Sequence, residues 1–218
     1  GLYGILNAAV HRDFKKMLAY CTIENIGIIG MGIGLGLIGI GRNNAALIIL
    51  GFGSALLHVL NHSLFKSLLF FSAGSVYQQT HARDMEKLGG LIKSMPQTAF
   101  LFLMGALAIG GLPPFNGFVS EFILYNGFLN GIKLPGIPFS TLMISSLAGL
   151  ALIGGISMIT FTKSFGTIFL GHPRTQLHED PKGVILSMRI PQYFIVVLML
   201  SIGLFPQFYF SVVNEIVL

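Results

Sequence analysis

Five apolar stretches of this 218-residue chain are long enough to cross a bilayer, which takes an α-helix of about 20 residues. Only 10% of the residues are charged, against about a quarter in a soluble domain. The sequence therefore predicts an all-α fold, a polytopic bundle of transmembrane helices that forms one domain over residues 1–218. The expected elements are the tail of a helix whose beginning is missing, at 1–10, and spans at roughly 17–40, 46–76, 96–131, 140–170 and 191–209.

The stretch 96–131 is too long for one straight helix and is interrupted at residues 110–115. Pro113 and Pro114 remove backbone donors, and a broken helix persists in lipid only where protein or a wet cavity satisfies the freed groups. The stretch could be one broken span or two short crossings, 96–112 and 115–131.

Positive charge separates these two alternatives. With one broken span, three loops share a side and hold nine Lys and Arg residues, three in each loop; the loops are 11–16, 79–95 and 171–190. The opposite side then holds only Arg42 and Lys133. Because basic loops face the cytoplasm, we expect one broken span in an inner (cytoplasmic) membrane, with these three loops cytoplasmic.

A line of ionisable residues inside the second full span is the best guide to function. His58, His62 and Lys66 are four residues apart, so on an α-helix they form one slanted line on one face. Ionisable groups at this depth are costly and usually lie on an ion or proton path. Lys66 needs either a carboxylate partner or the loss of its charge, and both assist proton movement. The two histidines have no carboxylate between them and no Cys cluster nearby, so no metal site is expected.

Three more charged residues lie within the spans, and each has an alternative to a transport role. Glu24 could form a structural hydrogen bond or ion pair, and Glu121, after the Pro-Pro break, could cap the restarted helix. Lys163 is expected to extend toward the membrane interface. The predicted proton pathway consists of Lys66, His58, His62, Glu121 and Glu24, with Asn61, Ser63, Ser67 and water able to bridge gaps.

Cofactor binding is not expected. The segment 34–39 matches the dinucleotide fingerprint G-x-G-x-x-G, but no strand precedes it and no acidic residue follows at the required distance. The single cysteine, Cys21, provides no ligand set for an iron–sulfur or nickel–iron centre. Electrons would therefore have to pass through partner subunits.

Four motifs resemble, in family order, those of the antiporter-like membrane subunits of respiratory complex I, Mrp-type sodium/proton antiporters and group 4 hydrogenases. The hydrogenase-4 and formate hydrogenlyase type is the most similar of these, and the matches run from residue 1 to about residue 170. The motifs lie at 13–27, 58–70, 83–91 and 111–121.

The resemblance implies two inverted five-helix repeats, each with a broken helix, and proton movement along buried charged residues at mid-membrane. Lys66 and Glu121 match members of that charged series, and His58 and His62 match residues that line its polar axis. The first repeat is absent, so the chain corresponds mainly to the second half. The implied partners are the lipid bilayer and other membrane and peripheral subunits of a hydrogenase or NADH dehydrogenase-like complex, without nucleic acid.

Three functional classes follow from these observations. A proton-translocating, non-redox subunit of an oxidoreductase complex uses the buried charges directly. A passive membrane anchor for a hydrogenase or dehydrogenase arm would not need them, so their presence counts against it. A subunit of an Mrp-type sodium/proton antiporter would carry the same residues, and the sequence does not separate it from the first class.

Overall fold

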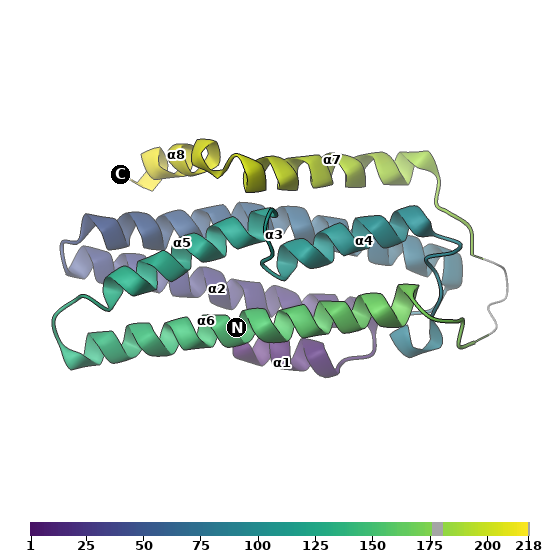
Figure 1. Cartoon of the computed structure of the whole chain (residues 1–218), viewed down its shortest axis with the longest axis horizontal. Coiled ribbons are helices and arrows are strands. Elements are labelled where there is room, and N and C mark those ends of the chain that lie inside the picture. Colours follow the sequence, from purple (N-terminus) through teal and green to yellow (C-terminus); the bar gives the residue numbers. More distant parts are fainter. Residues whose placement is uncertain (176–180, 218) are drawn as a thin grey trace.

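The computed structural model describes residues 1–175 and 181–217, and within these ranges every regular element is a helix (Figure 1). This confirms the prediction of an all-α transmembrane bundle. Four of the described helices, α2, α3, α6 and α7, are long and apolar enough to cross a membrane. The elements are α1 (Leu2–Val10), α2 (Phe14–Gly41), α3 (Ala45–Thr80), the 3-10 turn η1 (Met85–Lys87), α4 (Pro96–Ile109), α5 (Asn116–Gly131), α6 (Ile137–Phe169), α7 (Leu186–Leu204) and α8 (Pro206–Val217).

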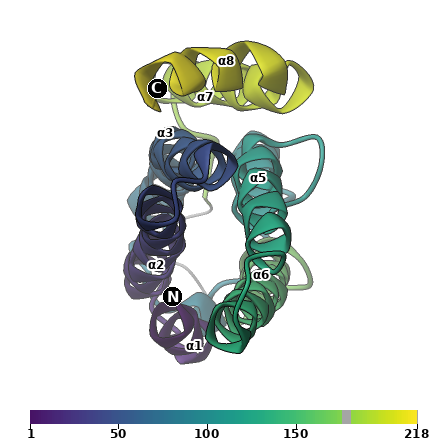
Figure 2. The same cartoon turned by 90° about the vertical axis from the view of Figure 1, so that its left-hand side faces the viewer.

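The helices form two rows, and α7 and α8 lie over one edge of both rows, beside α3 and α5 (Figure 2). One row contains α1, α2 and α3, and the other contains α5 and α6, with α4 continuing the line of α5. Within the first row, α2 and α3 approach so closely that a Cβ on Gly51 would collide with the backbone of Gly36. Small residues at such crossings allow helix backbones to touch in a membrane, where packing drives association.

The α4–α5 pair crosses the bundle once. The two helices lie end to end in Figure 1, joined by a break in which Gly111 has a φ of 65°. The amide of Leu112 still donates to the Leu107 carbonyl at 3.1 Å, and the amide of Phe115 donates to the Leu112 carbonyl at 3.0 Å. On the outside, α7 covers the break, because Gly203 lies directly against the Pro114 carbonyl.

Because the α4–α5 pair crosses the bundle once, the three basic loops meet at one end of the bundle. Backbone amides join them: Phe14 donates to the Arg83 carbonyl at 2.9 Å, and Gly90 donates to the Leu170 carbonyl at 2.9 Å. The two remaining turns meet at the other end, where the Arg42 guanidinium lies 3.9 Å from the centroid of the Phe139 ring. Part of the third basic loop, 176–180, lies outside the described residues.

The last span differs from the expected 191–209. Helix α7 begins at Leu186, extends through Pro191 and ends at Leu204, and a separate helix, α8, follows. Phe205 leaves the helical conformation, with φ −122° and ψ 53°, because a residue that precedes a proline is sterically disfavoured in the α region. Pro206 then starts α8 at a position where no backbone donor is needed.

Candidate functional site

A buried hydrogen-bond network joins α2, α3 and α5 in the space between the two rows. At its centre is His58, which is 2% exposed. Its Nδ1 lies 2.9 Å from Ser120 Oγ on α5, and its Nε2 lies 3.1 Å from Asn25 Oδ1 on α2. Because an amide oxygen only accepts, Nε2 carries the proton in this arrangement and Nδ1 of a neutral ring accepts from Ser120. Both ring nitrogens are therefore engaged within the protein.

A reciprocal pair of asparagines extends the network to the start of α5. The side-chain amide of Asn61 donates to the Asn116 carbonyl at 2.8 Å and to Ser120 Oγ at 2.9 Å. The amide of Asn116 donates back to Asn61 Oδ1 at 3.2 Å. Both asparagines are completely buried. They attach α3 to the first turn of α5, whose N-cap residue, Phe115, provides no side-chain hydrogen bond of its own.

Lys66 lies one turn of α3 beyond His62 and is 6% exposed. Its ammonium donates to the Leu18 carbonyl of α2 at 2.6 Å. No carboxylate of the described residues lies within 4.0 Å of this ammonium. The ion pair among the described residues joins Arg12 to Glu86 instead. The charge of Lys66 is therefore held by a backbone carbonyl rather than by a direct ion pair.

Glu24, on α2, is a second buried ionisable residue of the site. It is 1% exposed, and its Oε2 has no hydrogen-bond partner among the described residues. The buried hydroxyl of Ser157, on α6, also lacks a partner there. Both polar groups are therefore buried within the bundle, one on α2 and one on α6.

Glu121 is half-buried, and its carboxylate turns back toward the helix break. A Cβ added at Gly111 would lie only 2.8 Å from Glu121 Oε2, so the carboxylate lies against the Gly111 backbone. It makes no hydrogen bond with the first-turn amides of α5 among the described residues. The geometry therefore places this carboxylate at the break and not in a capping position.

The remaining sequence candidates lie at the edge of this network. His62 is half-buried, packs edge-to-face on Phe65 with ring centroids 5.6 Å apart, and leaves Nε2 without a partner among the described residues. Ser63 is exposed and bonds to the Leu60 carbonyl, and Ser67 is also exposed. Of the expected bridging side chains, only Asn61 joins the network.

Four residues of the site were not predicted: Asn25, Asn116 and Ser120 in the network, and the buried Ser157 on α6. Two of them directly adjoin a predicted acid in the sequence, Asn25 beside Glu24 and Ser120 beside Glu121. A search for polar neighbours of each buried charge would have found this pair. Ser157 carries no such signal, because its importance depends on the packing of α6 against α2.

Comparison with known proteins identifies the family. The model of a family described as "NADH:quinone oxidoreductase/Mrp antiporter, TM" matches residues 1–143. Hydrogenase-4 component B of Escherichia coli K12 is 36% identical over 203 residues, which cover 93% of this chain and 30% of that protein. Formate hydrogenlyase subunit 3 of the same organism is 44% identical over 188 residues, covering 86% of this chain and 31% of the relative. The chain thus spans just under a third of these relatives.

The fold is also similar to that of a solved membrane complex. A chain in the structure of the Mrp complex from Dietzia sp. DQ12-45-1b superimposes with a TM-score of 0.78 at 20% sequence identity. The match covers 99% of this chain and 44% of that chain.

Proposed function

This chain belongs to the NADH:quinone oxidoreductase/Mrp antiporter family of membrane proteins, and on that premise we propose that it carries protons through the membrane along its buried polar network. The relevant residues are the predicted Lys66, His58, His62, Glu121, Glu24 and Asn61, together with the newly identified Asn25, Asn116 and Ser120. The parent assembly is proposed to be a redox-driven complex of the hydrogenase type. This choice rests on the two Escherichia coli relatives.

The observation that carries the proposal is the continuity of the network across three helices. Bonds of 2.9 to 3.1 Å connect Asn25, His58 and Ser120, and therefore α2, α3 and α5. Histidine exchanges protons near neutral pH, and a hydroxyl both donates and accepts, so neighbouring groups can pass a proton between them. A passive anchor has no need to bury these groups, and burying them costs free energy.

The membrane orientation is also part of the proposal. Nine of the Lys and Arg residues lie in the three loops at one end of the bundle, and only two lie at the other end. By the positive-inside rule, the basic end faces the cytoplasm, and the protein lies in the inner (cytoplasmic) membrane. Glu121, beyond the break, lies in the half of the bundle that faces outward.

A second function is exchange of sodium for protons, because the family description also names the Mrp antiporter. The same buried groups would serve it. The discriminating observation is whether proton movement depends on an opposing sodium gradient.

The test uses vesicles that contain the complete parent complex, with proton uptake followed by a pH-sensitive dye. Lys66→Ala is expected to abolish uptake without loss of assembly, and Lys66→Arg is expected to impair it, since a guanidinium does not release its proton at working pH. Lys133→Ala, an exposed lysine at the other end of the bundle, is the matched control. Wild-type uptake by Lys66→Arg would exclude a lysine that gives up its proton.

A further inference from the structure

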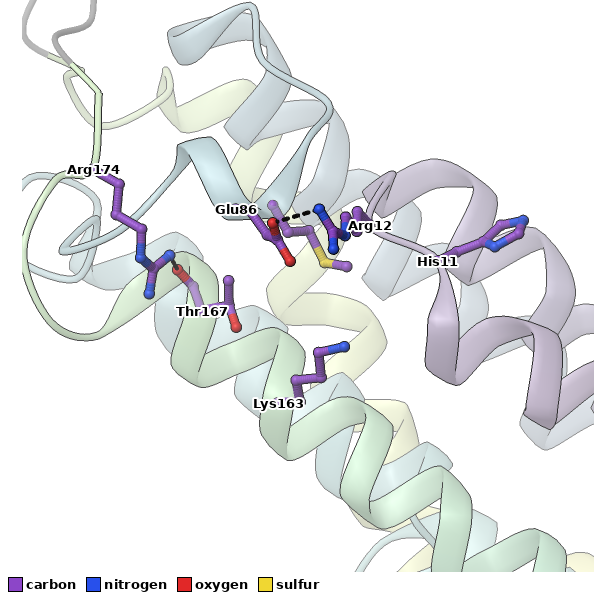
Figure 3. A pocket seen from close by; sticks show the side chains of 7 residues that line it. His11, Arg12, Glu86, Lys163, Thr167 and Arg174 are labelled. Carbon is purple, nitrogen blue, oxygen red and sulfur yellow. Dashed lines mark hydrogen bonds and ion pairs between the residues drawn. The ribbon is translucent and has the colours of Figure 1, made fainter.

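A charged cavity lies at the basic end of the bundle, away from the polar network. It has a volume of about 340 Å³ and is bounded by the end of α1, by η1, by the last turns of α6 and by the segment that follows α6 (Figure 3). One water occupies about 30 Å³ in the liquid, so the cavity has room for a group much larger than a water molecule. Its polar lining consists of His11, Arg12, Glu86, Lys163, Thr167 and Arg174.

Cations outnumber acids in this lining by three to one. Arg12 Nη1 is paired with Glu86 Oε2 at 3.0 Å, and this pair neutralises one of the three. Among the described residues, the ammonium of Lys163 makes a single long bond, of 3.4 Å, to the Ala9 carbonyl. In Figure 3 its side chain extends from α6 toward Arg12 and Glu86. Among the described lining residues, positive charge therefore exceeds what the Glu86 carboxylate balances.

Arg174 is held by backbone carbonyls and keeps donors available. Arg174 uses one nitrogen, Nη1, to hold the Leu88 carbonyl at 2.7 Å and the Thr167 carbonyl at 2.9 Å. A guanidinium has five N–H donors, so these contacts leave others to meet a ligand. Rigidly placed guanidinium and ammonium groups are the usual partners of phosphate oxygens.

We propose that this cavity binds a phosphate-bearing anion, through the ammonium of Lys163 and the remaining donors of Arg12 and Arg174. Its position at the loop end of membrane-spanning helices places it at the level of lipid headgroups, where basic pockets between helices bind anionic lipids. A bound phosphate would connect α1, α6 and the segment after α6. The same chemistry would accept a soluble phosphate, and the test distinguishes these sources.

The experiment measures lipid retained by the purified parent complex in native mass spectrometry, titrated with phosphatidylglycerol or with zwitterionic phosphatidylcholine. Wild type is expected to retain phosphatidylglycerol preferentially. Lys163→Gln is expected to weaken its binding about tenfold, as for loss of one charge-assisted contact, whereas Lys163→Arg retains it. The control is Lys93→Gln, which removes the same charge from an exposed lysine at the same end but outside the cavity.

Competition identifies the source of the anion. If inorganic phosphate displaces phosphatidylglycerol with the same dependence on Lys163, the site takes the free anion as well as the headgroup. If only the lipid binds, the site is a headgroup site. Equal retention by Lys163→Gln and Lys93→Gln, or no preference over phosphatidylcholine, would overturn the proposal.

Discussion

At the scale of single residues, Ser120 has the most constrained role in the network. Its one proton has two possible acceptors, His58 Nδ1 at 2.9 Å and the Gly117 carbonyl at 3.1 Å, and its oxygen also accepts from Asn61. When the imidazole is neutral, the hydroxyl donates to Nδ1. When the imidazole is protonated, Nδ1 becomes a donor and the hydroxyl turns to Gly117. The side chain therefore follows the charge of His58 without leaving its place.

Ser120→Ala tests this role. The substitution removes the hydroxyl that serves both His58 and Asn61. We expect proton uptake by vesicles of the parent complex to fall about a hundredfold, the low end of the usual range for one general acid or base. Ser63→Ala provides the control, because that serine is exposed and bonds only within its own helix. Equal rates for the two variants would remove Ser120 from the pathway.

Glu121 gives a second prediction at this scale. Glu121→Gln preserves the shape of the side chain beside Gly111 but not its ability to bind and release a proton, so we expect it to block proton uptake. Glu121→Asp retains the carboxylate and part of the activity. A purely structural role predicts normal proton uptake for Glu121→Gln and a lower melting temperature for Glu121→Ala. Measuring proton uptake and melting temperature for both variants distinguishes the structural role from the transport role.

The sequence alone predicted which residues lie within the membrane-spanning part better than it predicted which of their side chains are buried by a neighbouring helix. His58 and Lys66 were expected inside the bundle and are buried, whereas His62, on the same predicted line, is only half-buried. One helix considered alone does not show which neighbour covers each part of its face. Asn116 and Ser157 were missed for the same reason, since their meaning depends on contacts with helices distant in the sequence.

At the scale of the elements, the broken helix depends on close backbone contact with α7. Gly203 lies against the Pro114 carbonyl, so the methyl group of Gly203→Ala has no space. We expect a loss of about 1–3 kcal/mol in stability, as for other overpacked sites, seen as a lower melting temperature of the purified protein. Gly154→Ala on α6 is the matched control, because open space surrounds Gly154 and alanine favours helix. Similar melting temperatures for both variants would contradict this packing role.

Helix ends were the least predictable feature of the elements. The interruption at 110–115 was expected from two adjacent prolines, and α4 ends at Ile109 with α5 beginning at Asn116. The boundary between α7 and α8 was missed, because apolar residues continue through Phe205 and Pro206 and hide the change of helix. Hydropathy measures burial in lipid, whereas this boundary depends on the sterics of one residue before a proline.

At the scale of the whole molecule, the orientation in the membrane can be measured. Lys133→Cys and Lys87→Cys place one thiol at each end of the bundle, at positions that are both exposed. The native Cys21 is buried, so it should contribute little background. An impermeant thiol reagent applied to intact cells is expected to label position 133 and not position 87. The reverse pattern would place the basic loops outside.

The loop contacts described for the fold also determine where the bundle can deform. At the basic end, backbone hydrogen bonds join the three loops, from Phe14 to Arg83 and from Gly90 to Leu170. At the far end, side chains make the contacts between segments: Arg42 lies over the Phe139 ring, and the Ser140 hydroxyl donates to the Ile132 carbonyl at 3.2 Å. When a rigid helix is held at one end and tilts, its atoms move farther the more distant they are from that end. We therefore expect a rearrangement that opens the polar network to displace the far end of the bundle more than the basic end.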